Sequence, residues 1–229
     1  MNIRIDRGVS RWLVAHIFFL SLGVGQEQPS VLDLSRVVDG KGWRVVNRGM
    51  TRLPEGDKRG FRFDERMGQG IAWLEGAQFA SGVLEFDVRG KDVFQRSFIG
   101  IAFRGIDEET YEAIYFRPFN FKIPDSVRSS HSVQYVSHPT HTWQKLRSEK
   151  PGEFEKSVRP IPDPNDWFHA RVVVSDSTVT VYVNDSKEPS LEVPSLGNRK
   201  SGLVGLWVGN GSGGDFANLK IVGQKPSRQ

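Results

Sequence analysis

The chain contains no cysteine among its 229 residues. Disulfide bonds therefore cannot hold the fold together, and lipid attachment at a cysteine and catalysis by a thiol are both excluded. The net charge is also small, since the chain has 31 basic and 27 acidic residues, and it contains no block of Lys or Arg. The pattern lacks the basic patches typical of nucleic-acid-binding proteins, so nucleic acid is not an expected partner.

Long hydrophobic runs are scarce. One occurs at residues 12–25, after Arg4, Arg7 and Arg11, and it ends in small residues around Gly25. This layout is typical of a secretory signal peptide, and the run is shorter than the ~20 apolar residues that span a bilayer. The sequence therefore predicts a signal peptide at 1–25 and an exported protein, periplasmic or extracellular, with no transmembrane segment in the mature chain.

The remaining chain has the size of one domain with a substantial core. We predict a short tail at 26–30, a single domain at 31–223 and a C-terminal tail at 224–229. Removing the leader takes away three Arg and one Asp, so the net charge falls from +4 to +2, with 28 basic and 26 acidic residues.

Helical periodicity with capping residues is missing as well, and 24 glycines and 12 prolines interrupt the chain. Short alternating runs occur instead. The clearest, residues 168–183, predicts a hairpin that turns at Asp176 and Ser177. Many short strands without helical crossovers predict an all-β antiparallel sandwich or barrel. The residues we expect to be buried are Phe168, Val172, Val181, Leu203 and Ile221.

Further strands are expected at 97–104, 111–117, 132–136, 202–208 and 215–222, and the proline-rich segment 145–166 is expected to form loops. In the first of these strands the small residues Gly100 and Ala102 alternate with bulky ones and lead to Arg104. This pattern suits a solvent-facing concave sheet with room for a ligand. A β-bulge at Gly100 explains it equally well.

The order of several short motifs resembles that of a known superfamily. "SGVLEFDVRG", "FIGIAFRG", "YEAIYFRPFNF", "HSVQY" and "GGDFANLKI" follow one another along the chain. Together they resemble the concanavalin A-like lectin/glucanase superfamily, and within it the laminin-G-like jelly rolls related to the 3-keto-disaccharide hydrolase domain. The resemblance covers residues 31–223. It implies a two-sheet antiparallel jelly-roll sandwich whose concave face binds a sugar.

The glucanase branch of that superfamily carries Glu-x-Asp-x-x-Glu on one strand. Here Glu85 and Asp87 match the first two positions, but Gly90 stands where the second catalytic glutamate belongs. Retaining glycosidases need two carboxyl groups ~5–5.5 Å apart, so this departure argues against double-displacement chemistry.

A sugar site needs planar hydrogen-bonding groups beside an aromatic ring. Such residues gather in the stretch that begins at Glu112, where period two places Tyr115 and Arg117 on one strand face. We expect them to form one groove on the concave sheet with nearby polar and aromatic residues. The predicted ligand-binding residues are Arg104, Tyr115, Arg117, Asn120, Gln134 and Trp143.

Catalytic and metal-binding candidates are fewer. Glu112, His131 and His141 are candidates for proton transfer, and the same histidines with His138 could bind zinc, although loop histidines without a metal are commoner. Asp215 could hold a structural calcium, but a glycine-rich turn explains it equally well.

Three functions stay open at this point. The first is an exported protein that binds a glycan or oligosaccharide without strong catalysis. The second is a glycoside hydrolase or lyase of the 3-keto-disaccharide hydrolase type, for which a His and an acid within hydrogen-bond reach would be evidence. The third is a structural adhesion module, which a face filled by its own side chains would favour.

Overall fold

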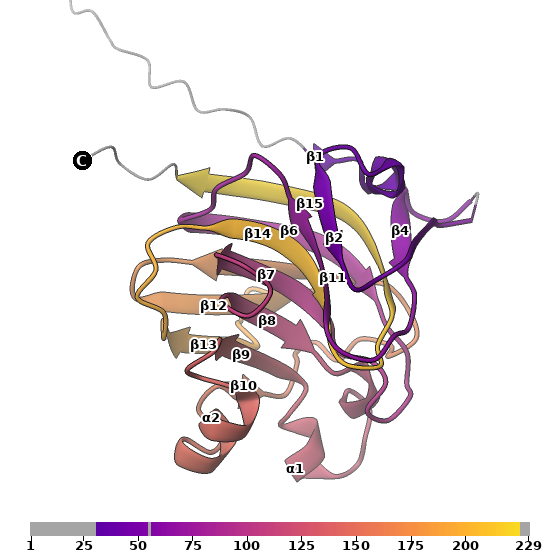
Figure 1. The fold of residues 1–229 in the computed structure, drawn as a ribbon. Helices are drawn as coiled ribbons and strands as arrows, with labels where there is room; N and C mark the ends of the chain where they lie inside the picture. Colours follow the sequence, from indigo (N-terminus) through magenta and orange to yellow (C-terminus); the bar gives the residue numbers. More distant parts are fainter. Residues whose placement is uncertain (1–30, 55, 225–229) are drawn as a thin grey trace, which may run out of the picture.

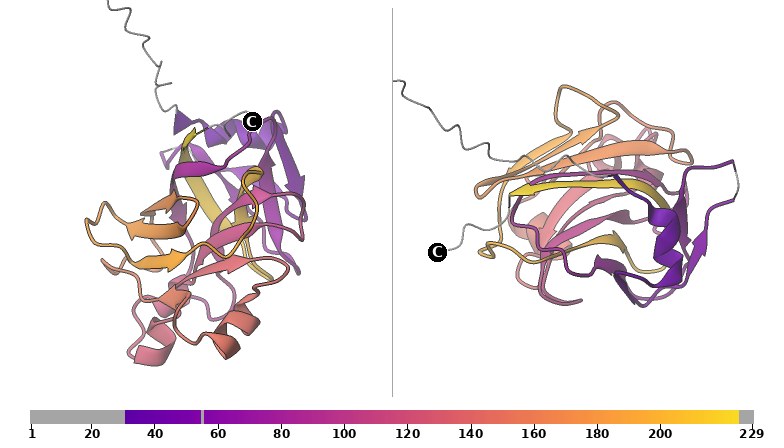
Figure 2. Two further views of the ribbon diagram at one scale, coloured as in Figure 1. Left: turned by 90° about the vertical axis from the view of Figure 1, so that its left-hand side faces the viewer. Right: turned by 90° about the horizontal axis from the view of Figure 1, so that it is seen from above.

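The computed structural model describes residues 31–54 and 56–224, so the predicted signal peptide and both predicted tails lie almost wholly outside the described residues. The chain forms two antiparallel sheets that stack face to face (Figures 1 and 2). The predicted two-sheet jelly-roll sandwich is confirmed.

One sheet has eight strands. Its order is β13 (Leu191–Pro194), β12 (Thr178–Val183), β11 (Phe168–Val174), β6 (Ser81–Arg89), β15 (Gly214–Gln224), β4 (Gly60–Phe63) and β3 (Met50–Arg52), with β1 (Val31–Leu32) also pairing with β15. The predicted hairpin is β11 and β12, and its turn falls where the sequence placed it.

The other sheet has seven strands. Its order is β10 (Glu155–Lys156), β9 (Val133–Ser137), β8 (Glu112–Phe116), β7 (Ile99–Gly105), β14 (Leu203–Val208), β5 (Gly70–Leu74) and β2 (Trp43–Val46). The strands predicted around residues 97–136 and 202–208 all form, with ends that differ by one or two residues.

Short helices were not expected from the sequence. Two 3₁₀ turns, η1 (Leu34–Asp39) and η2 (Pro118–Asn120), and two α-helices, α1 (Ser126–Ser129) and α2 (Trp143–Glu149), interrupt the strands. Thr142 caps α2 by accepting a hydrogen bond from the Lys145 backbone N–H. Figure 1 shows α1 and α2 beside β10 at one edge of the seven-stranded sheet. Among the described residues, no helix is long and apolar enough to cross a membrane.

The core lies between the sheets, where alternate residues of each strand meet. Phe116 of β8 packs edge to face on Phe168 of β11, with ring centroids 5.1 Å apart. Of the residues predicted to be buried, Phe168, Val172 and Val181 are, whereas Leu203 and Ile221 are only partly covered. The residues that alternate with this core on the seven-stranded sheet point away from the other sheet, and we call that side the outer face.

Candidate functional site

One row of residues crosses the outer face of the seven-stranded sheet in strict register. Trp207, Gly100, Tyr115, Gln134 and Glu155 are successive pairing partners on β14, β7, β8, β9 and β10. A Cβ at Gly100 would lie 2.0 Å from the Ile114 carbonyl oxygen, so this position must be glycine. The rings of Tyr115 and Trp207 meet across it, with centroids 5.1 Å apart. Gly100 therefore creates a close contact rather than a bulge.

The middle of this row is a hydrogen-bonded network. The Tyr115 hydroxyl donates to Gln134 Oε1 (2.8 Å), and Arg117 Nη2 donates to both the Tyr115 hydroxyl (2.8 Å) and Gln134 Oε1. Arg117 Nη1 donates to the His131 carbonyl oxygen (2.7 Å), and its guanidinium lies 4.8 Å from the Tyr115 ring centroid. Arg117 is only 5% exposed, so these contacts fix its planar group in one orientation.

Glu155 ends the row among three basic side chains. Arg147 forms a two-pronged contact with it (2.9 and 2.6 Å), His131 Nδ1 lies 2.8 Å from Oε1, and Arg117 Nη1 lies 3.6 Å from Oε2. Burial, together with the positive charge of Arg147 and Arg117, lowers the pKa of His131 although Glu155 opposes the shift. The side chains of Arg147 and His131 are 35% and 20% exposed, so the row reaches solvent here.

The opposite end of the row is aromatic. Trp207 Nε1 donates to the Tyr111 hydroxyl (3.2 Å), which itself donates to Gln69 (2.6 Å), and His138 stacks on the Tyr111 ring at 5.0 Å. Burial raises the pKa of Tyr111 to about 12. The side chains of the protein therefore cover much of the sheet at this end.

Two buried donors on the outer face have no acceptor within the described residues. They are Gln134 Nε2 and Trp73 Nε1. Ala72 and Leu206 are pairing partners that face the core, so the residues that follow them, Trp73 and Trp207, both lie on the outer face. A buried donor without a partner costs about 1–3 kcal/mol, so both atoms favour a site that water or a ligand oxygen completes.

The structure brings most of the predicted ligand-binding residues together. Tyr115, Arg117 and Gln134 form the network above, and Asn120 adjoins it by donating to the His131 carbonyl oxygen (3.3 Å). Trp143 is 40% exposed on α2, and the Arg147 guanidinium lies 5.1 Å from its ring centroid.

Three residues of the site, two in the row and one beside it, were not predicted from the sequence. Trp207 could have been found, since it lies in the predicted strand 202–208 on the same face as the small residue Gly205. Glu155 and Arg147 could not, because they belong to a two-residue strand and a short helix inside a segment that resembles a loop.

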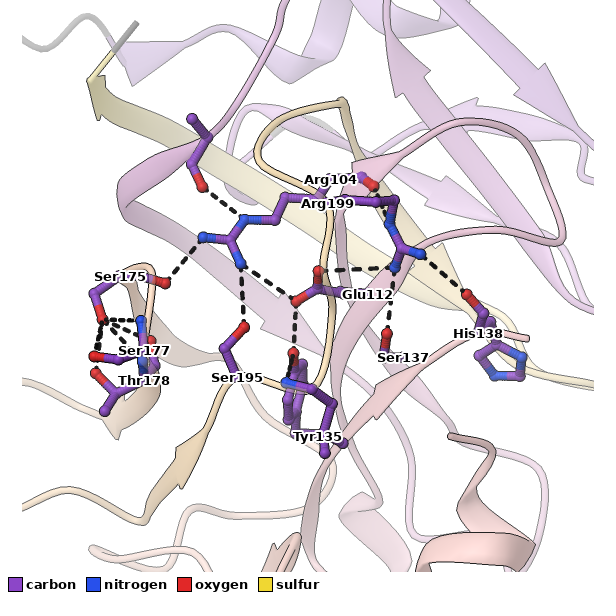
Figure 3. Close-up of polar contacts among 12 residues, drawn as sticks. Arg104, Glu112, Tyr135, Ser137, His138, Ser175, Ser177, Thr178, Ser195 and Arg199 are labelled. Atoms are coloured by element: carbon purple, nitrogen blue, oxygen red, sulfur yellow. Dashed lines mark hydrogen bonds and ion pairs between the residues drawn. The ribbon is translucent and has the colours of Figure 1, made fainter. Parts of the chain in front are cut away.

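Arg104 is the exception among the predicted residues: it lies on β7, next to the strand of Tyr115, but the prediction that it lines the same groove was wrong. Between Ala102 and Gly105 the register with β14 shifts by one residue, and Arg104 adopts φ 48°. This bulge reverses the alternation, so the guanidinium turns towards the space between the sheets. There it donates to the Ala80 and Ser175 carbonyl oxygens (2.7 and 2.9 Å; Figure 3).

Glu112, predicted as a catalytic candidate, lies beside Arg104 and is 0% exposed. It accepts a hydrogen bond from the Tyr135 hydroxyl (2.5 Å), and Arg104 and Arg199 each lie 3.7 Å away (Figure 3). Burial raises the pKa of Glu112 against the effect of these three groups. No ligand reaches a carboxylate so enclosed, so a role in proton transfer to substrate is not supported.

The three histidines proposed as zinc ligands occupy different surroundings. His131 contacts Glu155, His138 stacks on Tyr111, and His141 is half-buried near the end of β9, where its backbone bonds to Ser137. Among residues 31–54 and 56–224, no group of three or more histidine and acidic side chains is arranged to hold a metal ion.

Asp215 lies on the eight-stranded sheet. It accepts from Arg62 (2.6 and 2.9 Å) and from Arg89 (2.9 and 2.6 Å), so two guanidinium groups already balance its charge. A structural calcium at Asp215 stays a prediction.

Asp87, on the same outer surface of the eight-stranded sheet, accepts from His169 (2.8 Å), Lys58 (2.6 Å) and Asn218 (2.7 Å). Burial would raise its pKa, but these hydrogen bonds outweigh burial and lower the pKa to about 2. Glu85 pairs with Lys220 at 3.1 Å. The glucanase-like positions therefore form ion pairs within the sheet.

Comparison with known proteins gives a family and several structural neighbours. A family model described as "3-keto-alpha-glucoside-1,2-lyase-like domain" matches residues 34–222. The carbohydrate binding module CBM66 from Bacillus subtilis is similar in structure (TM-score 0.53, 17% identity), with 78% of this chain and 93% of that chain covered. A search of curated proteins found no match.

Two further solved structures are similar. A Bacillus subtilis protein of unknown function with a galectin-like fold has a TM-score of 0.54 and 12% identity, covering 84% of this chain and 97% of that one. The VIP36 exoplasmic/lumenal domain in its Ca2+/Man3GlcNAc-bound form has a TM-score of 0.50 and 14% identity, covering 81% and 86%. At these identities the likeness shows the fold alone.

Proposed function

The chain belongs to the 3-keto-alpha-glucoside-1,2-lyase-like domain family, and from this premise we propose that it binds a carbohydrate on the outer face of the seven-stranded sheet. The observation that carries the proposal is the row of Trp207, Tyr115 and Gln134 with Arg117 beside it. Sugars present apolar ring faces and many hydroxyls. Because these four residues are at most 7% exposed, a sugar would approach at the open end of the row, where Arg147 and His131 are partly exposed and the Trp143 ring lies beside Arg147. A fold alone would not support a function, so the weight rests on these side chains.

The neighbours agree with this proposal without carrying it. One is a carbohydrate binding module, and another was solved with Man3GlcNAc bound. The partner we propose is accordingly a glycan or oligosaccharide.

A glycan array followed by calorimetry on the hits tests binding. Arg147→Ala should weaken binding several-fold, because Arg147 lies at the open end of the row. Arg171→Ala is the matched control, since Arg171 packs on Tyr182 (4.0 Å) on the other sheet and should leave binding unchanged. Equal binding by both variants would show that the glycan binds elsewhere on the protein, and no binding to any glycan would favour an adhesion module.

A second candidate function is a lyase reaction on a 3-keto-glycoside, which the 2.8 Å approach of His131 to Glu155 favours. A 1,2-elimination removes the C2 proton, which the neighbouring ketone acidifies, and expels the group at C1 with its bonding electrons. A neutral histidine is the appropriate base, and the lowered pKa of His131 keeps it neutral near pH 7. Arg117 and Arg147 would stabilise the negative charge that develops on the ketone oxygen.

Turnover of methyl 3-keto-α-glucoside, followed by the absorbance of the unsaturated ketone, tests this second candidate. His131→Gln should lower kcat roughly 10²–10⁴-fold while retaining binding. His169→Gln is the control, because His169 contacts Asp87 at the same 2.8 Å on the opposite sheet. If His131→Gln retains the wild-type rate, the lyase mechanism fails while carbohydrate binding stands.

We also propose that the protein acts outside the cytoplasm, in the periplasm or the extracellular space. Mature protein recovered from a secreting host should begin near Gln26. Membrane-bound protein that retains Met1 would show that the leader is an anchor instead.

A further inference from the structure

An open cavity of about 490 Å³ lies at one end of the eight-stranded sheet. It is found where β4 and β6 end and β15 begins, three neighbouring strands that are labelled in Figure 1. In the register of the sheet Asp215 pairs with Arg62 on one side and with Arg89 on the other, and all three residues line the cavity. Of the described residues that line it, none belongs to the row on the other sheet. Its volume lies within the ~300–1,000 Å³ of small-molecule sites.

The wall of the cavity is held in place by buried contacts. Asp215 is 3% exposed and accepts from Nε and Nη2 of Arg62 (2.6 and 2.9 Å) and of Arg89 (2.9 and 2.6 Å). Trp167 packs on Arg89, whose guanidinium lies 4.8 Å from a ring centroid, and both side chains donate to Asp57 (2.9 and 2.7 Å). The two guanidinium planes are therefore oriented before any ligand arrives.

Both arginines keep a free donor. The contacts to Asp215 and Asp57 use Nε and Nη2, and among the described residues no acceptor contacts Nη1 of Arg62 or of Arg89. The two side chains are 52% and 23% exposed, so these N–H groups are open to solvent or a ligand. Acceptors line the same cavity, since the carboxylate of Glu65 is 43% exposed. Donors and acceptors are thus offered side by side.

The charges around the cavity cancel. The charged residues that line it are three bases and three acids, namely Arg62, Arg89, Lys91, Asp64, Glu65 and Asp215. Asp215 pairs with the two arginines, Glu65 with Lys91, and Asp64 with Arg66 at 2.7 Å. A charged ligand would have to break one of these pairs, because no charge is left uncompensated. A hydroxyl group needs no such exchange, since it donates to a carboxylate and accepts from a guanidinium at the same time.

We infer that this cavity is a second carbohydrate site, which binds one neutral sugar residue. The ligand that suits it is rich in hydroxyls and carries no net charge. Neighbouring hydroxyls of one sugar ring can accept from the Nη1 groups of Arg62 and Arg89 and donate to Glu65. The inference goes beyond the proposed site on the other sheet and does not depend on it. Two sites on one chain would hold a polysaccharide at two points and raise the overall affinity without further contacts.

NMR titration of the ¹⁵N-labelled full chain tests the second site, because each amide reports on its own surroundings. The neutral probes are the methyl glycosides of glucose, galactose, mannose and fructose, and methyl glucuronide is the acidic comparison. The backbone amides of Gly213 and Gly214 line the cavity. The Gly100 amide and the Trp143 indole report on the row and its open end. At least one neutral probe should shift Gly213 and Gly214 to saturation, and the glucuronide should bind there more weakly.

Arg62→Ala should weaken binding of that neutral probe roughly threefold to tenfold, because one donor is lost. Arg89 still pairs with Asp215 in this variant, so it should fold, and its thermal unfolding checks this. Arg52→Ala is the matched control. Arg52 lies on the neighbouring strand β3, is 57% exposed and contacts Asp39 at the same 2.6 Å, so its loss should leave the titration unchanged. Lys91→Ala changes a second lining residue, 45% exposed, and should also weaken binding if Arg62→Ala unfolds.

The other outcomes separate the two sites. Shifts confined to Gly100 and Trp143 overturn the second site and leave the proposed carbohydrate site standing. Tighter binding of the glucuronide than of every neutral probe at Gly213 and Gly214 shows an anion site, and the inference is then wrong. It is also wrong if Arg62→Ala and Arg52→Ala titrate alike, or if none of the five compounds shifts the two glycines.

Discussion

Two glutamates of this protein lie between pairs of arginines, on opposite faces of the same sheet. Glu112 lies between Arg104 and Arg199 in the space between the sheets, and both guanidinium groups stay 3.7 Å away. Glu155 lies on the outer face, where Arg147 forms a two-pronged contact with it. The residue types are alike, so the difference must come from where the sheet places each pair.

The backbone covers the ion pairs of Glu112, whereas those of Glu155 are open to solvent. A Cβ at Gly197 would lie 2.0 Å from Glu112 Oε1, so the loop before β14 sits directly on the carboxylate. At Glu155, the partly exposed side chains of Arg147 and His131 connect the pair to solvent. The same pairing of glutamate with arginine is therefore part of the buried core at Glu112 and within reach of a ligand at Glu155. We predict that substitutions will separate these two roles.

Arg104→Ala should have the largest effect. Removing one partner of a buried ion pair leaves an uncompensated charge and costs about 3–5 kcal/mol in the free energy of unfolding. Urea denaturation followed by circular dichroism measures it. A loss below about 1 kcal/mol would show that Arg199 alone compensates Glu112.

Arg117→Ala should weaken carbohydrate binding roughly tenfold to a hundredfold, since hydrogen bonds to charged groups contribute about 1.5–3 kcal/mol. Its cost in unfolding free energy should be smaller than that of Arg104→Ala, because Arg147 still pairs with Glu155. Calorimetry and urea denaturation on the same preparation test both parts. Wild-type binding by the folded variant would remove Arg117 from the site.

The two histidine–carboxylate pairs should titrate in opposite directions. Burial lowers the pKa of His131, so its protonation destabilises the fold as pH falls below 6.5 through the lowered value. The hydrogen bond that His169 donates to Asp87 raises the pKa of His169, so the stabilisation it gives is complete below pH 6.5 and is lost as pH rises through the raised value. Proton NMR of the two imidazoles measures both midpoints. A midpoint for His131 above that of His169 would contradict the assigned surroundings.

Trp143→Ala should have the smallest effect. The ring is 40% exposed, so its loss should change the free energy of unfolding by no more than about 0.5 kcal/mol. Binding should weaken about twofold to fivefold if the ring touches the ligand near Arg147. Unfolding at room temperature would show instead that Trp143 belongs to the core.

Alternation alone placed Tyr115 and Arg117 together, because β8 is regular and Arg117 follows its last residue directly. The same rule put Glu112 on the opposite face from Tyr115, where it lies. Alternation failed at Arg104, because a bulge adds one residue to β7 there and no feature of the neighbouring sequence indicates the bulge. Regular strands can thus be read from their pattern, and irregular ones cannot.

Glu155 shows a second limit. It joins the sheet through a two-residue strand that pairs with Gln134, and so short a strand has no period to detect. Its position depends on contacts with residues distant in sequence, which composition does not reveal. The fold could therefore be predicted from the sequence, whereas only the residues of the site that lie on the longer strands could be.

The last strand of the chain, β15, lies in the interior of its sheet between β6 and β4. During synthesis, β6 and β4 emerge first and must wait, with their inner edges unpaired, for residues 214–224. A nascent chain released early would present those edges to other molecules, which is the hazard of open strands. Folding is thus postponed until translation is nearly complete, and deletions at the C-terminal end should be tolerated far less well than their distance from Tyr115 would suggest.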